Sequence, residues 1–183
     1  MVNLAEPGRC RLRRAGGYHS PLFRPGDADI LALKDHTLVR IPVSGGEAES
    51  LYTIPGSIKL VGFSMADPDK VLILVQGNED TLPVGLLSLQ SGQVLPIPYD
   101  KQSPEDQLLL AHLQGWERVY TNTTVYVKRE TKMGMAGLKE WTDIYYKRGD
   151  NEPVNLSRCD GNHCGQPALS HDGRQVVFVH AQP

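Results

Sequence analysis

Histidine is the side chain most often used as a metal ligand or proton carrier, and this sequence holds six, all scattered. No His-x-x-x-His pair would bring two imidazoles onto one helix face. His19 and His163 each stand just before a strand-like stretch and are the weak candidates for a metal site. The Gly-x-Ser-x-Gly turn of hydrolases and a phosphate-binding loop with Lys-Ser/Thr are both absent. The sequence therefore predicts no catalytic residues and no cofactor.

The cysteines allow three different states. There are three of them, Cys10, Cys159 and Cys164, and an odd count does not indicate a disulfide framework. Cys159 and Cys164 bracket a short polar loop and could form a disulfide in an oxidising compartment, or remain free thiols. A zinc ion held by both thiols and His163 is the third state, but the Cys-x4-Cys spacing is loose and no fourth ligand is evident nearby.

The side chains best suited to bind a partner gather between residues 116 and 141. Aromatic and methionine side chains bury large areas at interfaces. The stretch Lys132–Glu140 contains two glycines and interrupts a strand-like pattern, so we expect an inserted recognition loop there. The predicted binding residues are Trp116, Tyr120, Met133, Met135, Leu138 and Trp141.

A repeated strand pattern must position these residues. Residues 166–179 align with residues 20–33 without a gap, at an offset of 146 residues, so that Pro167 falls on Pro21. Each segment reads as a short strand, a turn with Gly and Asp, and a second, apolar strand. This pattern is typical of a β-hairpin.

A third copy lies between these two, where Phe63 follows Phe23 by 40 residues. A second strand–turn–strand pattern follows the complete copies, with a glycine in its turn to supply the positive φ of tight hairpins. Two hairpins make a four-stranded unit, and a radial array of such units is a β-propeller. We therefore expect an all-β fold, a β-propeller-like array of four-stranded antiparallel blades. The predicted repeats span residues 18–56, 57–100, 116–160 and 161–183.

One helix is predicted within this all-β pattern, at residues 104–114. Ser103 is a good N-cap and Pro104 suits the first turn. Leucines then form an apolar stripe before Gly115 ends the helix. We expect this inserted helix to pack against the side or face of the repeated β-structure.

The segment 167–179 resembles the TolB-like, WD40-like (PD40) repeat, whose consensus there is close to P-x-F-S-P-D-G-K-x-I-x-F. This sequence has His171 where the family has proline, and the first copy has Gly26-Asp27 in place of Asp-Gly. The resemblance implies a β-propeller that is often periplasmic or exported in bacteria and usually binds proteins without catalysis. A minority of related propellers are lyases or accessory domains of peptidases.

The number of repeats leaves closure of a ring open. The chain holds about 3.5 to 4 repeats, whereas closed propellers have about four to eight blades. Residues before Tyr18 could add one strand to close a ring. The alternatives are a compact ring with an incomplete blade, an open piece, or two chains that combine. An unpaired sheet edge would favour such a homodimer.

The bulk composition limits the class of protein. With 183 residues, 40% hydrophobic and 22% charged, the chain is typical of a soluble globular protein, and we expect one domain over residues 1–183. A net charge of −2 gives no footprint for nucleic acid. No apolar run reaches the ~18 residues that cross a bilayer. The first residues lack a signal-peptide core, so the protein is either cytoplasmic or exported with its signal already removed.

These observations favour a non-catalytic binding scaffold that contacts a protein partner through blade loops. Two alternatives stay open. One is a metal- or sugar-binding propeller enzyme of lyase or hydrolase type, with its site at the channel mouth near His19 and His163. The other is a partial propeller that self-assembles into an oligomer.

Overall fold

A computed structural model describes residues 2–3, 16–26, 28–64, 67–76, 84–96, 118–120, 123–170 and 173–181. Within these ranges the regular structure consists of β-strands, so the predicted all-β class is confirmed. The helix predicted at 104–114 lies outside the described residues. Among the residues that are described, none belongs to a helix with the length and apolar character needed to span a membrane.

The chain divides into two compact units, and each is described by itself. One unit comprises residues 15–115, and the other combines residues 1–14 with residues 116–183. Whether these units behave as the single domain expected from the sequence stays a prediction.

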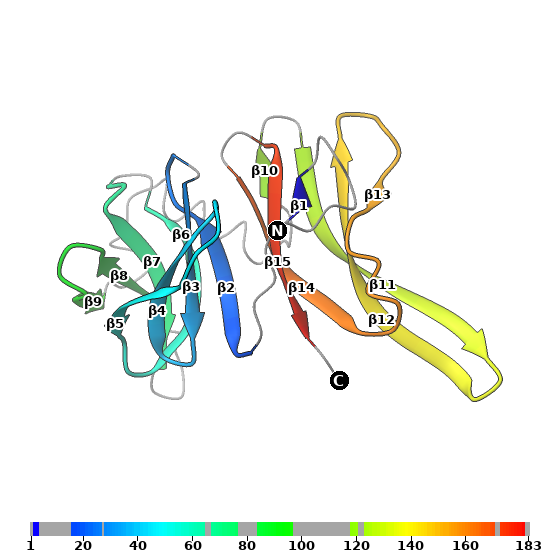
Figure 1. The fold of residues 1–183 in the computed structure, drawn as a ribbon, viewed down its shortest axis with the longest axis horizontal. Coiled ribbons are helices and arrows are strands. Elements are labelled where there is room, and N and C mark those ends of the chain that lie inside the picture. Colours follow the sequence, from blue (N-terminus) through cyan, green and yellow to red (C-terminus); the bar gives the residue numbers. More distant parts are fainter. Residues whose placement is uncertain are drawn as a thin grey trace. The chain divides into compact units, whose positions relative to one another are not determined.

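The unit of residues 15–115 contains two four-stranded antiparallel sheets, with orders β2-β3-β4-β5 and β6-β7-β8-β9 (Figure 1). Consecutive strands are neighbours throughout, so each sheet is a simple meander. The segments 18–56 and 57–100, predicted as the first two repeats, therefore form one meander each. The strands are β2 Tyr18–Phe23, β3 Asp29–Lys34, β4 Thr37–Pro42, β5 Glu49–Thr53, β6 Ser57–Phe63, β7 Lys70–Val75, β8 Val84–Ser88 and β9 Val94–Pro96.

Both sheets of this unit contribute to one apolar core. In β3 all four residues from Ile30 to Leu33 are buried, and in β7 the three from Val71 to Ile73. Strands buried on both faces need a continuous apolar run in place of an alternating one, which is what these segments show. The core cluster joins Leu22, Leu31, Leu33, Leu38, Ile54, Leu60, Val71, Ile73 and Leu87.

The second unit contains one seven-stranded mixed sheet of order β1-β15-β14-β12-β11-β10, with β13 paired to β12 as well. Strands β10 to β13 form a third meander from the predicted repeat 116–160. The last hairpin, β14–β15, joins the same sheet through a parallel contact between Thr142 and His163. The strands are β1 Val2–Asn3, β10 Arg118–Tyr120, β11 Thr123–Gly134, β12 Gly137–Arg148, β13 Val154–Asn155, β14 His163–Leu169 and β15 Gln175–Ala181.

A strand from the N-terminal segment is present, as the sequence suggested. β1 pairs antiparallel with β15, with Val2 opposite Val176 and Asn3 opposite Gln175. The last repeat, which supplies only one hairpin of its own, thus gains a third strand from the other end of the chain.

The two segments that align at an offset of 146 residues share a backbone irregularity as well as a sequence pattern. A β-bulge interrupts the pairing after His19 in β2 and after Gly165 in β14. Inside each bulge one residue takes a left-handed conformation, Ser20 with φ of 53° and Gln166 with φ of 52°. Side chains other than glycine rarely adopt this conformation. Its recurrence at equivalent positions supports the gapless alignment of the two copies.

Candidate functional sites

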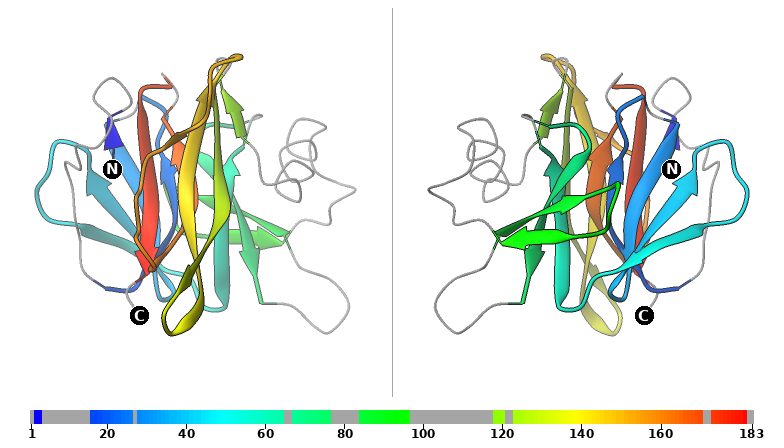
Figure 2. Two further views of the ribbon diagram at one scale, coloured as in Figure 1. Left: turned by 90° about the vertical axis from the view of Figure 1, so that its right-hand side faces the viewer. Right: turned by 90° about the vertical axis from the view of Figure 1, so that its left-hand side faces the viewer.

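The prediction that Lys132–Glu140 is a loop is wrong, because this segment forms the outer end of a continuous β-hairpin (Figure 2). Strands β11 and β12 pair from Thr123–Arg148 out to Gly134–Gly137. Only two residues connect them, and Gly137 takes a φ of +108°, which suits a tight turn. The glycines that suggested a loop therefore build a hairpin turn.

The end of this hairpin exposes three large apolar side chains. Met133 is 75% exposed, Met135 106% and Leu138 59%. Met133 and Leu138 are directly opposite each other across the two strands, so they share one face of the hairpin. We call these three residues the hairpin tip. They are the predicted binding residues that the structure brings together on an exposed element.

Of the other three predicted binding residues, two lie in described strands. Trp141 is half-buried, and its Nε1–H donates a hydrogen bond to Asp143 Oδ2 at 3.0 Å. Tyr120 lies in β10, where its backbone pairs with Thr123. Trp116 lies outside the described residues. Trp141 is therefore held against its own strand by this bond and is not part of the exposed hairpin tip.

The opposite face of the same hairpin carries an aromatic and charged cluster nearer its base. Tyr126 and Tyr145 are cross-strand neighbours whose ring centroids lie 6.0 Å apart. The Tyr145 hydroxyl donates to Glu130 Oε1 at 2.6 Å, and Lys128 Nζ lies 3.0 Å from the same oxygen. The bond from Tyr145 and the nearby ammonium of Lys128 lower the pKa of Glu130, and the same bond raises the pKa of Tyr145. This cluster stabilises the hairpin beneath the tip.

A buried carboxylate in β12 organises the segment that follows. Asp143 is 3% exposed and accepts four hydrogen bonds. Burial raises the pKa of Asp143, but these bonds to the ionised form outweigh burial, and the net shift is downward. The donors are Trp141 Nε1, Asn155 Nδ2, Ser157 Oγ and the backbone N–H of Cys159. Asp143 thus holds residues 155–159 against the sheet through hydrogen bonds.

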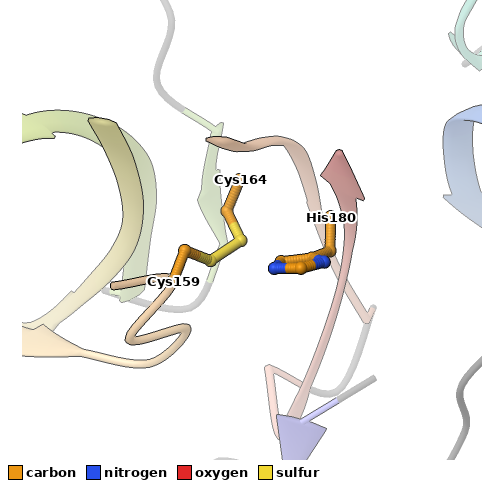
Figure 3. Close-up of side chains that lie close together, drawn as sticks. All are labelled: Cys159, Cys164 and His180. Carbon is orange, nitrogen blue, oxygen red and sulfur yellow. A yellow bond between two sulfur atoms is a disulfide. The ribbon is translucent and has the colours of Figure 1, made fainter. Parts of the chain in front are cut away.

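The two cysteines at the end of this segment form a disulfide beside a histidine (Figure 3). Cys159 and Cys164 have Cα atoms 6.3 Å apart and belong to the apolar core of the unit. The His180 imidazole lies next to the sulfur pair, and potential ligand atoms of all three residues lie within 4.8 Å of one another. Cys164 and His180 face each other across β14 and β15.

The histidines singled out by the sequence are placed differently. His163 Nδ1 lies 3.4 Å from Thr142 Oγ1. His19 Nδ1 lies 3.2 Å from Ser20 Oγ, and its Nε2 lies 3.2 Å from the carbonyl oxygen of Asp35. Within the described residues, neither belongs to the group that could hold a metal ion.

Sequence reasoning missed His180 and Asp143. The alignment of the last copy with the first places Cys164 and His180 at the positions of Tyr18 and Lys34. These two positions are opposite each other in both hairpins, because β2 and β3 pair in the same register as β14 and β15. For Asp143 the only signal was an acidic residue within an apolar strand pattern, which predicts an edge or solvent-facing position as readily as a buried anchor.

Comparisons with known proteins add little. No family model matches the chain, and no curated protein is similar to it. One similar structure is described as “putative TolB” from Agrobacterium tumefaciens, with 17% identity, a TM-score of 0.36, and coverage of 88% of this chain and 53% of that one. Two structures of AtxE2 isopeptidase have 13% and 14% identity, TM-scores of 0.35 and 0.37, and coverage of 89% and 86% of this chain.

The chain spans about half the length of the first of these structures and 29% of the isopeptidase chains. TM-scores this low do not establish a shared fold. The class of protein therefore rests on the strand pairing, which defines, for the described residues, an all-β structure with two four-stranded sheets and one seven-stranded sheet.

Proposed function

We propose that this chain is a non-catalytic scaffold that binds a protein partner through the hairpin tip. The observation that carries this proposal is the exposure of Met133, Met135 and Leu138 at the end of a regular hairpin. Covering apolar surface on association contributes roughly 25 cal/mol per Å². Because two paired strands and the two-residue turn between them present these side chains, little backbone freedom is lost on binding.

The proposed scaffold is a β-propeller-like array. Three consecutive four-stranded meanders, β2–β5, β6–β9 and β10–β13, support this interpretation. The hairpin β14–β15 with β1 supplies a further, three-stranded group. In propellers the strand connections at the rims commonly contact partners.

The test replaces Met133, Met135 and Leu138 together by serine. Proteins from native lysate are cross-linked to this variant and to the unaltered chain, and the captured amounts are compared. We expect at least about a tenfold loss of the proteins captured by the unaltered chain, with thermal stability nearly unchanged because the tip is exposed. A matched control replaces Ile58 and Leu95, 47% and 60% exposed, by serine and retains capture. Equal capture by the tip variant would show that this surface is not the binding site.

Self-assembly of partial propellers is a second candidate, favoured by the open edges of the sheets. In the described part of the chain, β5 and β9 each end a four-stranded sheet. Edge strands offer unpaired N–H and C=O groups to another chain. Light scattering separates this candidate from the first, because a mass of 20.2 kDa in solution would exclude it.

A further inference from the structure

The disulfide lies in a group of three side chains that resembles a set of metal ligands. Cys159 comes from the segment after β13, Cys164 from β14 and His180 from β15, and the imidazole lies beside both sulfurs (Figure 3). We propose that, in the reduced protein, Cys159, Cys164 and His180 bind one zinc ion, and that the disulfide is the metal-free, oxidised form of the same site. This inference is independent of the hairpin tip.

The protein holds the two cysteines close together by bonds other than the disulfide. The backbone N–H of Cys159 donates to Asp143 Oδ1 at 2.6 Å. The hydroxyl of Thr142 donates to the carbonyl oxygen of Cys164 at 2.8 Å. Strand β12 therefore fixes both cysteine backbones through neighbouring residues, and reduction leaves the two thiols side by side.

The histidine is fixed by strand pairing. Cys164 and His180 are directly opposite residues of an antiparallel pair, so their side chains leave the same face of the sheet. His163 precedes Cys164 in β14 and leaves the other face, because successive side chains alternate along a strand. The ligand set is thus two thiolates and His180, without His163.

The spacing and surroundings suit zinc. Zn–S bonds of about 2.3 Å and Zn–N bonds of about 2.0 Å place tetrahedral ligand atoms about 3.3 to 3.8 Å apart. The three ligand atoms already lie within 4.8 Å of one another. Cys159 and Cys164 are buried and His180 is exposed, so the core shields the sulfur side while solvent reaches the histidine side. Three protein ligands leave a fourth position for water or an exogenous ligand.

Conversion between the disulfide form and the zinc-bound form of the site conserves electrons and protons. A dithiol reductant gives two electrons and two protons to the Cys159–Cys164 bond, which breaks into two thiols while the reductant becomes a disulfide. Zinc then displaces both thiol protons, and neutral His180 donates its ring nitrogen lone pair. In the reverse direction the thiolates give two electrons to a disulfide oxidant, which takes two protons from water and becomes two thiols, while the Cys159–Cys164 bond re-forms and zinc leaves.

The experiment uses the full chain with Cys10→Ser, so that only two thiols are present. Cobalt(II) is titrated into oxidised and phosphine-reduced protein, and then displaced by zinc. We expect one equivalent in the reduced protein, with thiolate-to-cobalt charge transfer and tetrahedral d–d bands, and none in the oxidised protein. Cys159→Ser and Cys164→Ser should each remove most of the charge-transfer absorption.

The histidine variants decide the ligand set. His180→Gln should weaken zinc binding at least about tenfold, whereas the matched control His163→Gln should leave it unchanged. Circular dichroism of the reduced, metal-free protein tests whether Asp143 and Thr142 hold the cysteines in place. Equal metal binding by oxidised and reduced protein, equal effects of the two histidine variants, or unfolding on reduction would each overturn the proposal.

Discussion

The first and last hairpins of the chain are built on the same backbone but carry different chemistry. β2–β3 and β14–β15 have the same register, the same bulge and a left-handed residue at the same point. At the outer cross-strand pair the first hairpin has Tyr18 opposite Lys34, with the ammonium 5.6 Å from the ring centroid. The last hairpin has Cys164 opposite His180 at the equivalent pair.

This difference shows how equivalent cross-strand positions can carry different side chains without a change in the strand pairing. Because the two hairpins share their bulge and register, the same cross-strand pair holds a cation and an aromatic ring in one hairpin and a disulfide-bonded cysteine and an imidazole in the other. The last hairpin also needs a second element, because Cys159 comes from outside it and is positioned by Asp143.

The largest expected effect separates the two hairpins. Asp143→Ala leaves four buried or half-buried donors without their acceptor and should destabilise its unit by about 3 kcal/mol. Hydrogen exchange should rise in residues 155–164 and stay unchanged in residues 18–34. An exposed turn residue of the same unit, Asp150, serves as the control on replacement by alanine. Faster exchange in both hairpins would mean that the last one does not depend on Asp143 in particular.

Acid should weaken the last hairpin first. The pKa of Asp143 is lowered from its ordinary value of 3.8, so its contribution is present above that pH and is lost as the pH falls through the folded-state pKa. Unfolding by urea at pH 7 and below about pH 4 should show that the stability gap between the unaltered chain and Asp143→Asn narrows in acid. A gap that is constant with pH would contradict a charged Asp143 in the folded state.

The shared bulge should respond to substitution in the same way in both hairpins. Ser20→Val and Gln166→Val place a β-branched side chain at positive φ and should each destabilise by about 1 to 2 kcal/mol. Asparagine tolerates this conformation better, so Ser20→Asn and Gln166→Asn are the matched controls. Thermal unfolding of the four variants provides the comparison. A penalty at only one of the two positions would show that the bulges are not equivalent.

The smallest expected effect belongs to the first hairpin alone. Lys34→Gln removes the ammonium near Tyr18 and should cost about 0.5 kcal/mol, because the contact is exposed. His180→Gln, at the equivalent position of the last hairpin, should reduce the free energy of unfolding of the oxidised protein by less than Lys34→Gln does. Urea unfolding measures the free energy of unfolding of both variants. Equal reductions would contradict the prediction, because they would mean that the two cross-strand pairs stabilise their hairpins equally.

Much of the fold was predictable because its signals are local. Turn residues and apolar runs marked the hairpins at residues 20–33 and 166–179, and no long-range contact was needed to find them. The outer part of the β11–β12 hairpin was missed because Lys132, Lys139 and Glu140 interrupt the apolar alternation by which strands are identified. Its residues are exposed on both faces, so no core demanded that alternation.

The site was predictable only in part. The two cysteines are close in sequence, and their proximity could be proposed from the intervening loop. The choice between His163 and His180 required the register of β14 with β15. His163 is next to Cys164 in the sequence but lies on the other face of the sheet, whereas the distant His180 is directly opposite Cys164 on the same face. The role of Asp143 depended on where residues 155–159 return to β12, which no local pattern records.

The pairing of β1 with β15 also bears on the order in which the protein can assemble during translation. Val2 is synthesised long before Val176, its partner in the sheet. The unit of residues 15–115 is continuous and can fold while synthesis proceeds, whereas β15, the partner of β1 among the described residues, is available only after it has left the ribosome. Strand β1 is thus made before the unit of residues 15–115 but is paired with β15 only after translation has passed residue 176.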